Sequence, residues 1–291
     1  MSVLELDSLS VRFGGHLAVS DVSMKVEGGR VSGLIGPNGA GKTTTFNAIC
    51  GVVNPSAGRV RLGGKDITKV GTHKRARLGI GRTFQRLEVF HSLTVRENIQ
   101  VGLEIRRSWS RRGGALPQYL ADGGDPDPAA EIDLILERLD LGHLADQPVG
   151  ALPTGHARLV ELGRALAARP SILLLDEPAS GLDDAETDIF GDLLVTLAGN
   201  GLGILLVEHD VALVMRVCTQ LSVLDFGQVI ASGTPEVVRA NEAVLAAYLG
   251  TAPAAVSAST PLPPALGGDG VHPAAAGGLT GDGVHGNGHH S

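Results

Sequence analysis

Apolar and polar residues alternate along the chain in short segments separated by turn residues. The apolar runs predict strands at residues 3–6, 19–26, 31–35, 58–64, 172–175 and 204–207. The last two runs contain no polar residue, which is typical of central parallel strands covered on both faces. Residues 221–230 predict a hairpin that turns at Gly227.

A helical pattern replaces the strand pattern in the middle of the chain, from about residue 86 to residue 168. Its clearest helices are expected at 93–103 and 129–139. Helices are also expected at 43–50 and, as a single element, at 236–249. Because strands and helices alternate again after Pro170, the pattern predicts an α/β fold that contains a helical segment.

The composition changes at Thr251, from which Ala, Gly, Pro and Ser dominate. Such a segment cannot bury enough apolar surface to offset the entropy of ordering it, so residues 251–291 are expected to be a disordered tail. The pentapeptide Gly-Asp-Gly-Val-His occurs twice there, and the tail holds four of the ten histidines. Composition favours a low-complexity tail over metal capture by these histidines.

The whole chain has the composition of a globular protein, with 43% of its 291 residues hydrophobic and 19% charged. Its net charge of −7 argues against a general nucleic-acid binder. The acidic N-terminus does not resemble a secretory signal, and no apolar stretch reaches the roughly 18–20 residues of a spanning helix. We therefore expect a cytosolic protein whose contact with a membrane is peripheral. Cys50 and Cys218 lack metal-ligand spacing and are expected to be buried free thiols.

Residues 36–44 match the phosphate-binding pattern G-x-x-x-x-G-K-[ST] and follow the predicted strand at 31–35. Glycines let the backbone wrap closely around phosphate oxygens, and the helix that starts near Gly41 adds the positive end of its dipole. Lys42 is expected to neutralise the β- and γ-phosphates, and the Thr43 hydroxyl is expected to bind Mg²⁺. The loop residues expected at the nucleotide are Gly36, Pro37, Asn38, Gly39, Ala40, Gly41, Lys42, Thr43 and Thr44.

Polar residues with catalytic potential follow the two fully apolar runs. Asp176 and Glu177 come directly after the first run, where Asp176 suits the magnesium side of the site and Glu177 suits polarisation of the attacking water. An Asp-Glu-Pro turn is the simpler interpretation, but the phosphate loop favours the catalytic one. His209 follows the second run and is expected at the same sheet edge, in contact with the γ-phosphate. Gln85 stands where the chain enters the helical segment.

These motifs, in this order, resemble those of the ATP-binding cassette (ABC) transporter ATPases over nearly all of residues 1–250. The phosphate loop resembles Walker A, and Asp176 with Glu177 resembles Walker B and its catalytic glutamate. His209 resembles the switch histidine. Gln85 resembles the Q-loop glutamine, which implies contacts with the γ-phosphate and the metal ion.

Two further positions follow from the resemblance. Residues 180–183 resemble the D-loop, which implies that Asp183 lies near the nucleotide. Phe13 occupies the place of the aromatic residue that stacks on adenine, and one aromatic face suffices for a purine. The alternative for Phe13 is a core residue after the first strand.

The family's signature, Leu-Ser-Gly-Gly-Gln, covers the ATP of a partner subunit and corresponds here to residues 152–156. The serine is replaced by Pro153, so the Thr154 hydroxyl is the candidate substitute. Gly155 and the start of the following helix retain the means to hold a phosphate. His156 is interpreted as a polar replacement for the glutamine. The resemblance implies that Thr154, Gly155 and His156 contact the partner's nucleotide.

The resemblance implies an α/β fold: a P-loop NTPase (RecA-like) core with an antiparallel β subdomain and an inserted α-helical subdomain at about 86–168. It implies ATP and Mg²⁺ as ligands and ATP hydrolysis coupled to transport. The implied partners are two membrane permease subunits, a second ABC ATPase subunit in a homodimer or heterodimer and, indirectly, a solute-binding protein; no nucleic-acid partner is expected. The implied location is the cytoplasmic face of the inner (plasma) membrane, as a peripheral protein.

Several segments resemble the ATPases of bacterial branched-chain amino acid importers, namely residues 12–15, 81–85, 93–98, 206–210 and 247–250. The ATPase of lipopolysaccharide export has similar segments, so lipid export is an alternative. A non-transport ABC ATPase is another, although the chain has one cassette and no heptad array. The unusual signature also leaves open a hydrolysis-poor subunit of an asymmetric pair.

Two surface features have competing interpretations. Residues 106–112 are basic around Trp109, and a solvated loop is favoured over contact with anionic lipids. An apolar cluster follows Gln85 and consists of Leu87, Val89, Phe90 and Leu93. In the family this neighbourhood forms the groove for the permease's coupling helix, and an ordinary core is the rival interpretation.

Overall fold

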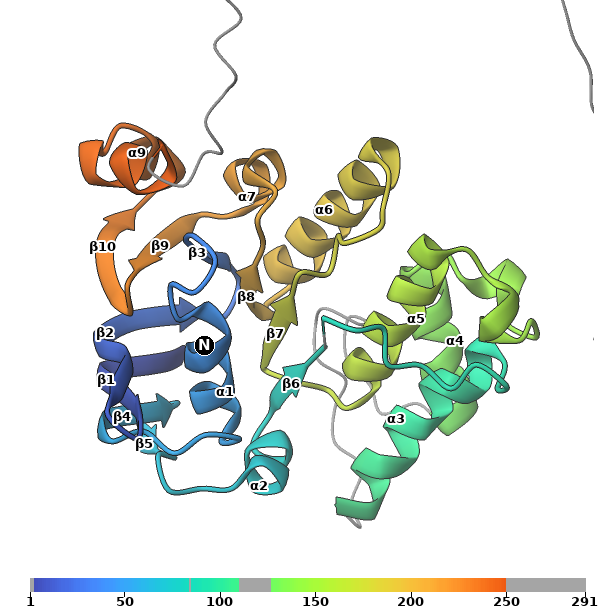
Figure 1. Ribbon diagram of the computed structural model, residues 1–291. Coiled ribbons are helices and arrows are strands. Elements are labelled where there is room, and N and C mark those ends of the chain that lie inside the picture. The colour runs from blue at the N-terminus through green and yellow to red at the C-terminus, as the bar shows by residue number, and fades with distance from the viewer. Residues whose placement is uncertain (1–2, 84, 110–126, 250–291) are drawn as a thin grey trace, which may run out of the picture. The chain divides into compact units, whose positions relative to one another are not determined.

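The computed structural model describes residues 3–83, 85–109 and 127–249, which form two sheets flanked by helices (Figure 1). The first sheet is antiparallel, with strand order β2-β1-β4-β5. Its strands are β1 (Val3–Phe13), β2 (His16–Glu27), β4 (Ala57–Leu62) and β5 (Lys65–Asp66). Leu4 of β1 lies opposite Val26 and Leu62, and all three side chains are buried, so one face of this sheet is apolar.

The second sheet has the order β10-β9-β3-β8-β7-β6. Its strands are β3 (Val31–Ile35), β6 (Ile80–Arg82), β7 (Ile172–Asp176), β8 (Gly203–Val207), β9 (Gln220–Asp225) and β10 (Gln228–Gly233). Neighbouring strands from β9 to β6 are parallel, whereas β9 and β10 form the predicted antiparallel hairpin. The carboxyl ends of β3, β8 and β7 therefore meet at one edge.

The fully apolar strands are buried on both faces. In β7, Leu173 and Leu175 pack in a core that contains the helical segment, whereas Ile172 and Leu174 pack in a second core with the antiparallel sheet. Because side chains alternate along a strand, a strand between two cores needs apolar residues at every position. This placement explains the unbroken apolar runs in the sequence.

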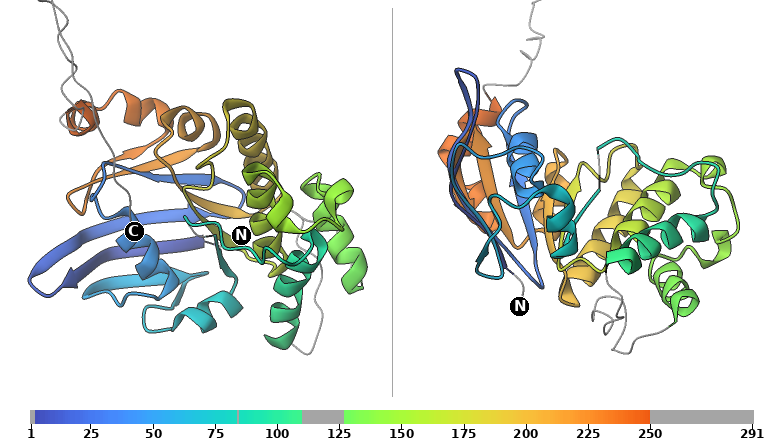
Figure 2. Two further views of the ribbon diagram at one scale, coloured as in Figure 1. Left: turned by 45° about the vertical axis from the view of Figure 1, so that its right-hand side comes forward. Right: turned by 90° about the horizontal axis from the view of Figure 1, so that it is seen from below.

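The helices are α1 (Lys42–Cys50), α2 (Thr72–Arg77), α3 (Val95–Trp109), α4 (Pro128–Arg138), α5 (Thr154–Ala167), α6 (Asp184–Gly199), α7 (Val211–Val217), α8 (Pro235–Arg239) and α9 (Glu242–Leu249). Two 3₁₀ turns, η1 (Gly142–Leu144) and η2 (Val149–Ala151), precede α5. Helices α3, α4 and α5 pack together beside the six-stranded sheet (Figure 2). Among the described residues, no helix combines the length and apolarity needed to cross a membrane.

The predicted single helix at 236–249 is wrong. The structure has two helices there, α8 and α9, with a break at Ala240 and Asn241. The Asn241 side-chain oxygen accepts the backbone N–H groups of Ala243 and Val244 at 2.9 and 3.2 Å, so Asn241 caps a new helix instead of continuing the previous one.

The structure also tests the predictions for the two cysteines and for the basic segment at 106–112. Cys50 and Cys218 are buried free thiols, as predicted. The prediction of a solvated loop at 106–112 is wrong for its first residues, which belong to α3. Arg106 Nη1 lies 2.6 Å from Oε1 of the buried Glu131. Residues 110–112 and the predicted tail at 251–291 lie outside the described residues.

Candidate nucleotide-binding and catalytic site

The phosphate loop joins β3 to α1 and depends on glycine at its bends. Gly36, Gly39 and Gly41 all have positive φ angles, of 149°, 81° and 104°. A Cβ at Gly36 would lie 2.0 Å from the Leu224 carbonyl oxygen, so no larger residue fits there. A Cβ at Gly39 would meet no atom within 4 Å, which marks the open side of the loop. Gly41 is the N-cap residue of α1 and has no side chain with which to cap the helix, so the first amides of α1 suit an anion.

Lys42 lies across the loop. Its Nζ donates hydrogen bonds to the carbonyls of Gly36 and Pro37 at 2.6 and 3.0 Å. Burial lowers the pKa of Lys42 from its ordinary value, and the nearby charges of Glu177 and Asp176 oppose that shift. The ammonium group is thus poised between the loop and the two acidic residues, where a phosphate group would attract it.

The two acids of the site lie at the end of β7. Asp176 is only 4% exposed, and its Oδ2 accepts a hydrogen bond from Arg82 Nη2 at 3.3 Å. Burial raises the pKa of Asp176, while the charge of Arg82 opposes this effect. Glu177 follows with a φ of 48°, and its N–H donates to the Val207 carbonyl at 2.8 Å. This left-handed backbone turns the Glu177 side chain away from the strand axis and into the site.

Two predicted residues from distant parts of the chain lie beside the Glu177 carboxylate. Gln85 Nε2 donates to Glu177 Oε2 at 2.8 Å, and His209 Nδ1 lies 3.8 Å from Glu177 Oε1. His209 follows β8, which pairs with β7 in parallel, so the sheet itself brings them together. A glutamine, a glutamate and a histidine therefore surround one position next to the phosphate loop. Such an arrangement can orient and activate a water molecule.

The Q-loop backbone is held by α5. Arg158 Nη2 donates to the Gln85 carbonyl at 3.1 Å, and Glu161 Oε1 accepts the Glu88 N–H at 3.4 Å. Arg164 donates to the Glu88 carbonyl. The backbone at Gln85 and Glu88 is thus held by the helix that begins with the signature residues.

Glu208 and Arg82 are site residues that sequence reasoning missed. The Glu208 side chain is buried and accepts the N–H groups of Ala179 at 2.8 Å and His209 at 3.2 Å. It therefore joins the loop after Glu177 to the segment that carries His209. Arg82 and Glu208 lie in residues 81–85 and 206–210, two segments that resemble the importer ATPases. The sequence pattern does not distinguish a buried carboxylate or arginine from an exposed one.

The remaining predicted residues occupy two other places. Phe13 ends β1 and is 51% exposed, so it is not the core residue of the alternative interpretation. Thr154, Gly155 and His156 form the first turn of α5, which Pro153 precedes without a side-chain cap. The structure thus places the signature on the helical segment and the phosphate loop on the sheet (Figure 1).

The signature turn is packed against residues of its own chain. A Cβ at Gly155 would lie 2.5 Å from Glu186 Oε1, and the rings of His156 and His143 meet edge to face with centroids 6.3 Å apart. Asp183 accepts the Glu186 N–H at 2.8 Å and caps α6 in a reciprocal capping box. The Asp183 carboxylate thus has a structural function in this arrangement, and its contact with a nucleotide stays a prediction.

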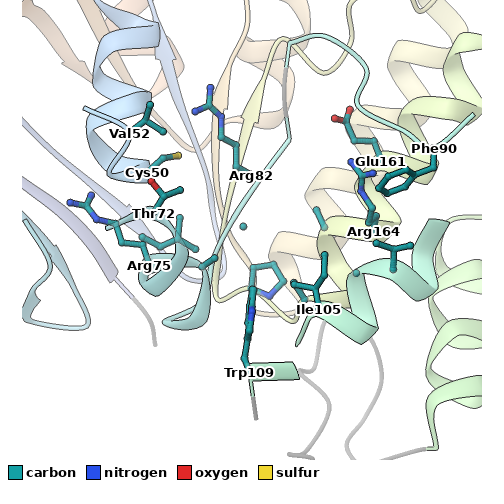
Figure 3. Close-up of a pocket in the computed structure, with 18 residues that line it drawn as sticks. Cys50, Val52, Thr72, Arg75, Arg82, Phe90, Ile105, Trp109, Glu161 and Arg164 are labelled. Carbon is teal, nitrogen blue, oxygen red and sulfur yellow. The ribbon is translucent and has the colours of Figure 1, made fainter. Parts of the chain in front are cut away.

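A groove opens beside the segment that follows Gln85 (Figure 3). Its volume is about 390 Å³, and Phe90, Ile105 and Trp109 supply apolar walls. In the predicted apolar cluster, Leu87 and Val89 pack against the main core, whereas Phe90 is 47% exposed and faces the groove. The cluster is therefore partly core, and docking of a permease helix beside Phe90 stays a prediction.

The donors of the site fit a magnesium ion bound with a nucleotide. Thr43 is exposed in the first turn of α1, and Asp176 supplies a carboxylate at the end of β7. Hydroxyl and carboxylate oxygens, completed by phosphate oxygens and water, suit the hard Mg²⁺ ion.

A phosphate loop at one strand end, with an acid pair and a histidine at the neighbouring ends, defines a P-loop ATPase. Residues 19–180 match the family model described as ABC transporter, and residues 228–254 match the model of the branched-chain amino acid ATP-binding cassette transporter. The chain belongs to the ABC transporter ATPase family, whose members couple ATP hydrolysis to transport.

Named ATP-binding proteins of bacterial transporters are similar to most of the chain. BraF of Pseudomonas aeruginosa, a branched-chain amino acid transport ATP-binding protein, is 39% identical over 251 residues, which are 86% of this chain and 98% of BraF. LptB of Haemophilus influenzae, from the lipopolysaccharide export system, is 37% identical over 86% of this chain and 98% of its own. LivG of Escherichia coli K12 is 36% identical with the same coverage.

Solved structures support the predicted fold class. The ADP conformation of MJ1267, an ATP-binding cassette of an ABC transporter, has a TM-score of 0.71 and 30% identity, and the match covers 86% of this chain and 99% of that one. A nucleotide-free cassette matches with the same TM-score and identity. The P-loop NTPase fold expected from the sequence is therefore confirmed.

Proposed function

We propose that this chain is the ATP-hydrolysing subunit of an importer for branched-chain amino acids or a similar small polar solute. The convergence of Gln85, Glu177 and His209 beside the Lys42 loop carries the hydrolytic part of the proposal. The similarity to BraF and LivG and the family match over residues 228–254 support the choice of solute.

The residues of the site have complementary functions in this proposal. The loop amides and Lys42 bind the phosphates, with Lys42 exchanging its bonds to the Gly36 and Pro37 carbonyls for bonds to phosphate oxygens. Thr43, Asp176 and Gln85 would hold Mg²⁺, which neutralises phosphate charge.

Glu177 polarises the attacking water in this proposal, while Gln85 and His209 orient the water and the γ-phosphate. Phe13 presents an exposed ring on which adenine stacks.

The site needs a second ABC ATPase subunit to close it. Thr154, Gly155 and His156 begin a 14-residue helix without a side-chain cap, so their amides suit a phosphate group on a neighbouring chain. The α6 N-terminus with Asp183 lies beside the same turn. Binding of ATP between two such chains, identical or different, would close the dimer and drive two permease subunits between inward and outward states.

The permease subunits would dock at the groove next to Phe90, which places the chain at the cytoplasmic face of the inner membrane as a peripheral subunit. A solute-binding protein would deliver the solute from the other side. The groove supports this proposal because α5 lines it through Glu161 and Arg164 and also carries the signature turn. A helix seated there would push directly on the element that contacts ATP.

Transport by a reconstituted complex tests the proposal. The chain would be purified with a candidate branched-chain amino acid permease pair, placed in proteoliposomes, and assayed for uptake of labelled leucine with its solute-binding protein. We expect ATP-dependent uptake that Glu177→Gln abolishes. Absence of uptake, together with ATPase activity that responds to a lipopolysaccharide-export permease pair instead, would favour the alternative function suggested by the LptB similarity.

A further inference from the structure

Strand β6 and the Q-loop after it send one side chain to each of the two adjacent acids of the site. Arg82 Nη2 donates to Asp176 Oδ2 at 3.3 Å, and Gln85 Nε2 donates to Glu177 Oε2 at 2.8 Å. The parallel pairing of β6 with β7, in which Arg82 lies opposite Leu174, positions the Arg82 side chain for this contact. Gln85 has an assigned function in the family resemblance, whereas Arg82 has none.

Arg82 is anchored at a second point. Its Nη1 donates to Asn47 Oδ1 on α1 at 2.8 Å, and its guanidinium carbon lies 5.5 Å from the centre of the Phe46 ring. The Arg82 side chain is 15% exposed and the Asp176 side chain 6% exposed. The planar guanidinium therefore bridges the helix after the phosphate loop and the acid of β7, where both side chains are mostly buried.

A carboxylate that binds a metal ion needs a fixed orientation. Outer partners that hydrogen-bond a ligating group provide that orientation, and their loss typically weakens metal binding by about 10–100-fold. Arg82 has this geometry toward Asp176, since one fork nitrogen holds the carboxylate while the other is fixed to Asn47.

We propose that Arg82 is a positioning residue that orients Asp176 for the magnesium ion of bound nucleotide. The inference rests on the proposed function of Asp176 as the magnesium-side acid. Arg82 also lines the groove, and Figure 3 shows its guanidinium turned toward the side on which Cys50 and Val52 lie. A permease helix in the groove would thus contact the side chain that holds the metal ligand.

A competing function for Arg82 predicts the opposite result. A cation beside Asp176 could merely neutralise the carboxylate and compete with Mg²⁺ for it. Removing such a competitor would strengthen magnesium binding, whereas removing a positioning residue weakens it. The sign of the change therefore separates the two functions.

The measured quantity is the gain in affinity for a fluorescent, non-hydrolysable ATP analogue when Mg²⁺ replaces EDTA. In the full chain we expect Arg82→Met to reduce this gain by about tenfold, with the affinity in EDTA unchanged. Arg82→Lys keeps the charge but cannot span both anchors, so it should also lose most of the gain. The matched control is Arg106→Met, which removes another arginine that is 18% exposed and paired with a buried acid. It should leave the gain intact.

Two more variants make every outcome informative. Asn47→Ala keeps Arg82 but frees one end of it, so a smaller loss of the gain is expected even if Arg82→Met fails to fold. An unchanged or larger gain in the Arg82 and Asn47 variants would overturn the inference. If Asp176→Asn also keeps the full gain, the proposed function of Asp176 fails and the inference fails with it. Loss of the gain in Asp176→Asn alone would remove only the function assigned to Arg82.

Discussion

Replacing Glu177 by glutamine removes one proton acceptor and little else. Glu177 Oε2 accepts the hydrogen bond from Gln85 at 2.8 Å, and a glutamine at 177 can turn its carbonyl oxygen to accept the same bond. The side chain is 24% exposed, and a neutral amide costs less to bury than a carboxylate, so the substitution adds no desolvation cost. The backbone bond of residue 177 to the Val207 carbonyl does not involve the side chain. Folding and nucleotide binding should therefore survive.

The effect on hydrolysis should be large. A positioned general base contributes about 10²–10⁴ in rate. This range corresponds to about 3–5 kcal/mol in the activation free energy, at ~1.36 kcal/mol for each factor of ten. An amide cannot accept a proton from water at neutral pH, so the variant should lose most of this contribution. We expect kcat to fall by about 10²–10⁴ while the affinity for ATP is unchanged.

Phosphate release by the purified chain, with and without a permease pair, measures kcat, and a fluorescent nucleotide measures affinity. Glu137→Gln, at an exposed position on α4, is the control for the change of charge and should behave as wild type. Turnover of Glu177→Gln near the wild-type rate would refute the function assigned to Glu177. Loss of nucleotide affinity in parallel with turnover would show that Glu177 binds the nucleotide rather than activating water.

Two further predictions concern adenine binding and stability. Phe13→Ala should weaken nucleotide binding by about tenfold, because stacking of a base on an aromatic ring contributes about 1–3 kcal/mol. The melting temperature should change little, since Phe13 is 51% exposed, and unchanged affinity would exclude stacking. Glu131→Gln should cost about 3–5 kcal/mol in urea unfolding, because it leaves Arg106 and Arg169 without a buried carboxylate. Burial raises the pKa of Glu131, but the hydrogen bonds from these two arginines outweigh it and hold the pKa below its ordinary value. The contribution of Glu131 is therefore fully present above the ordinary carboxyl pKa and is lost as the pH falls through the lowered one. The wild type should lose more stability than Glu131→Gln on acidification below about pH 4, and equal losses would contradict this assignment.

The positions of the site's main motifs were predictable because these motifs are local. The phosphate loop needs consecutive glycines at its bends, and the acids must follow an apolar strand directly, so both leave a pattern within a few residues. The burial of β7 and β8 on both faces is also predictable from local sequence, because each strand contains one unbroken apolar run. The break at Asn241 was missed because a capping asparagine and a solvated helical asparagine look alike in a sequence.

The sequence alone determined that the chain has the motifs of a nucleotide-binding ABC ATPase and where its phosphate loop and acid pair lie, because short-range backbone geometry and local residue order set these features. Only the tertiary structure decided that Arg82 bridges Asn47 and Asp176 and that Glu208 joins the segments of Ala179 and His209. The contacts of Arg82 with Asn47 and Asp176, and of Glu208 with Ala179, join residues 29 to 94 positions apart in the sequence, which only the fold brings together. The physical reason is burial: a charged side chain that the fold encloses must find a partner there, and the packing of the elements selects which one.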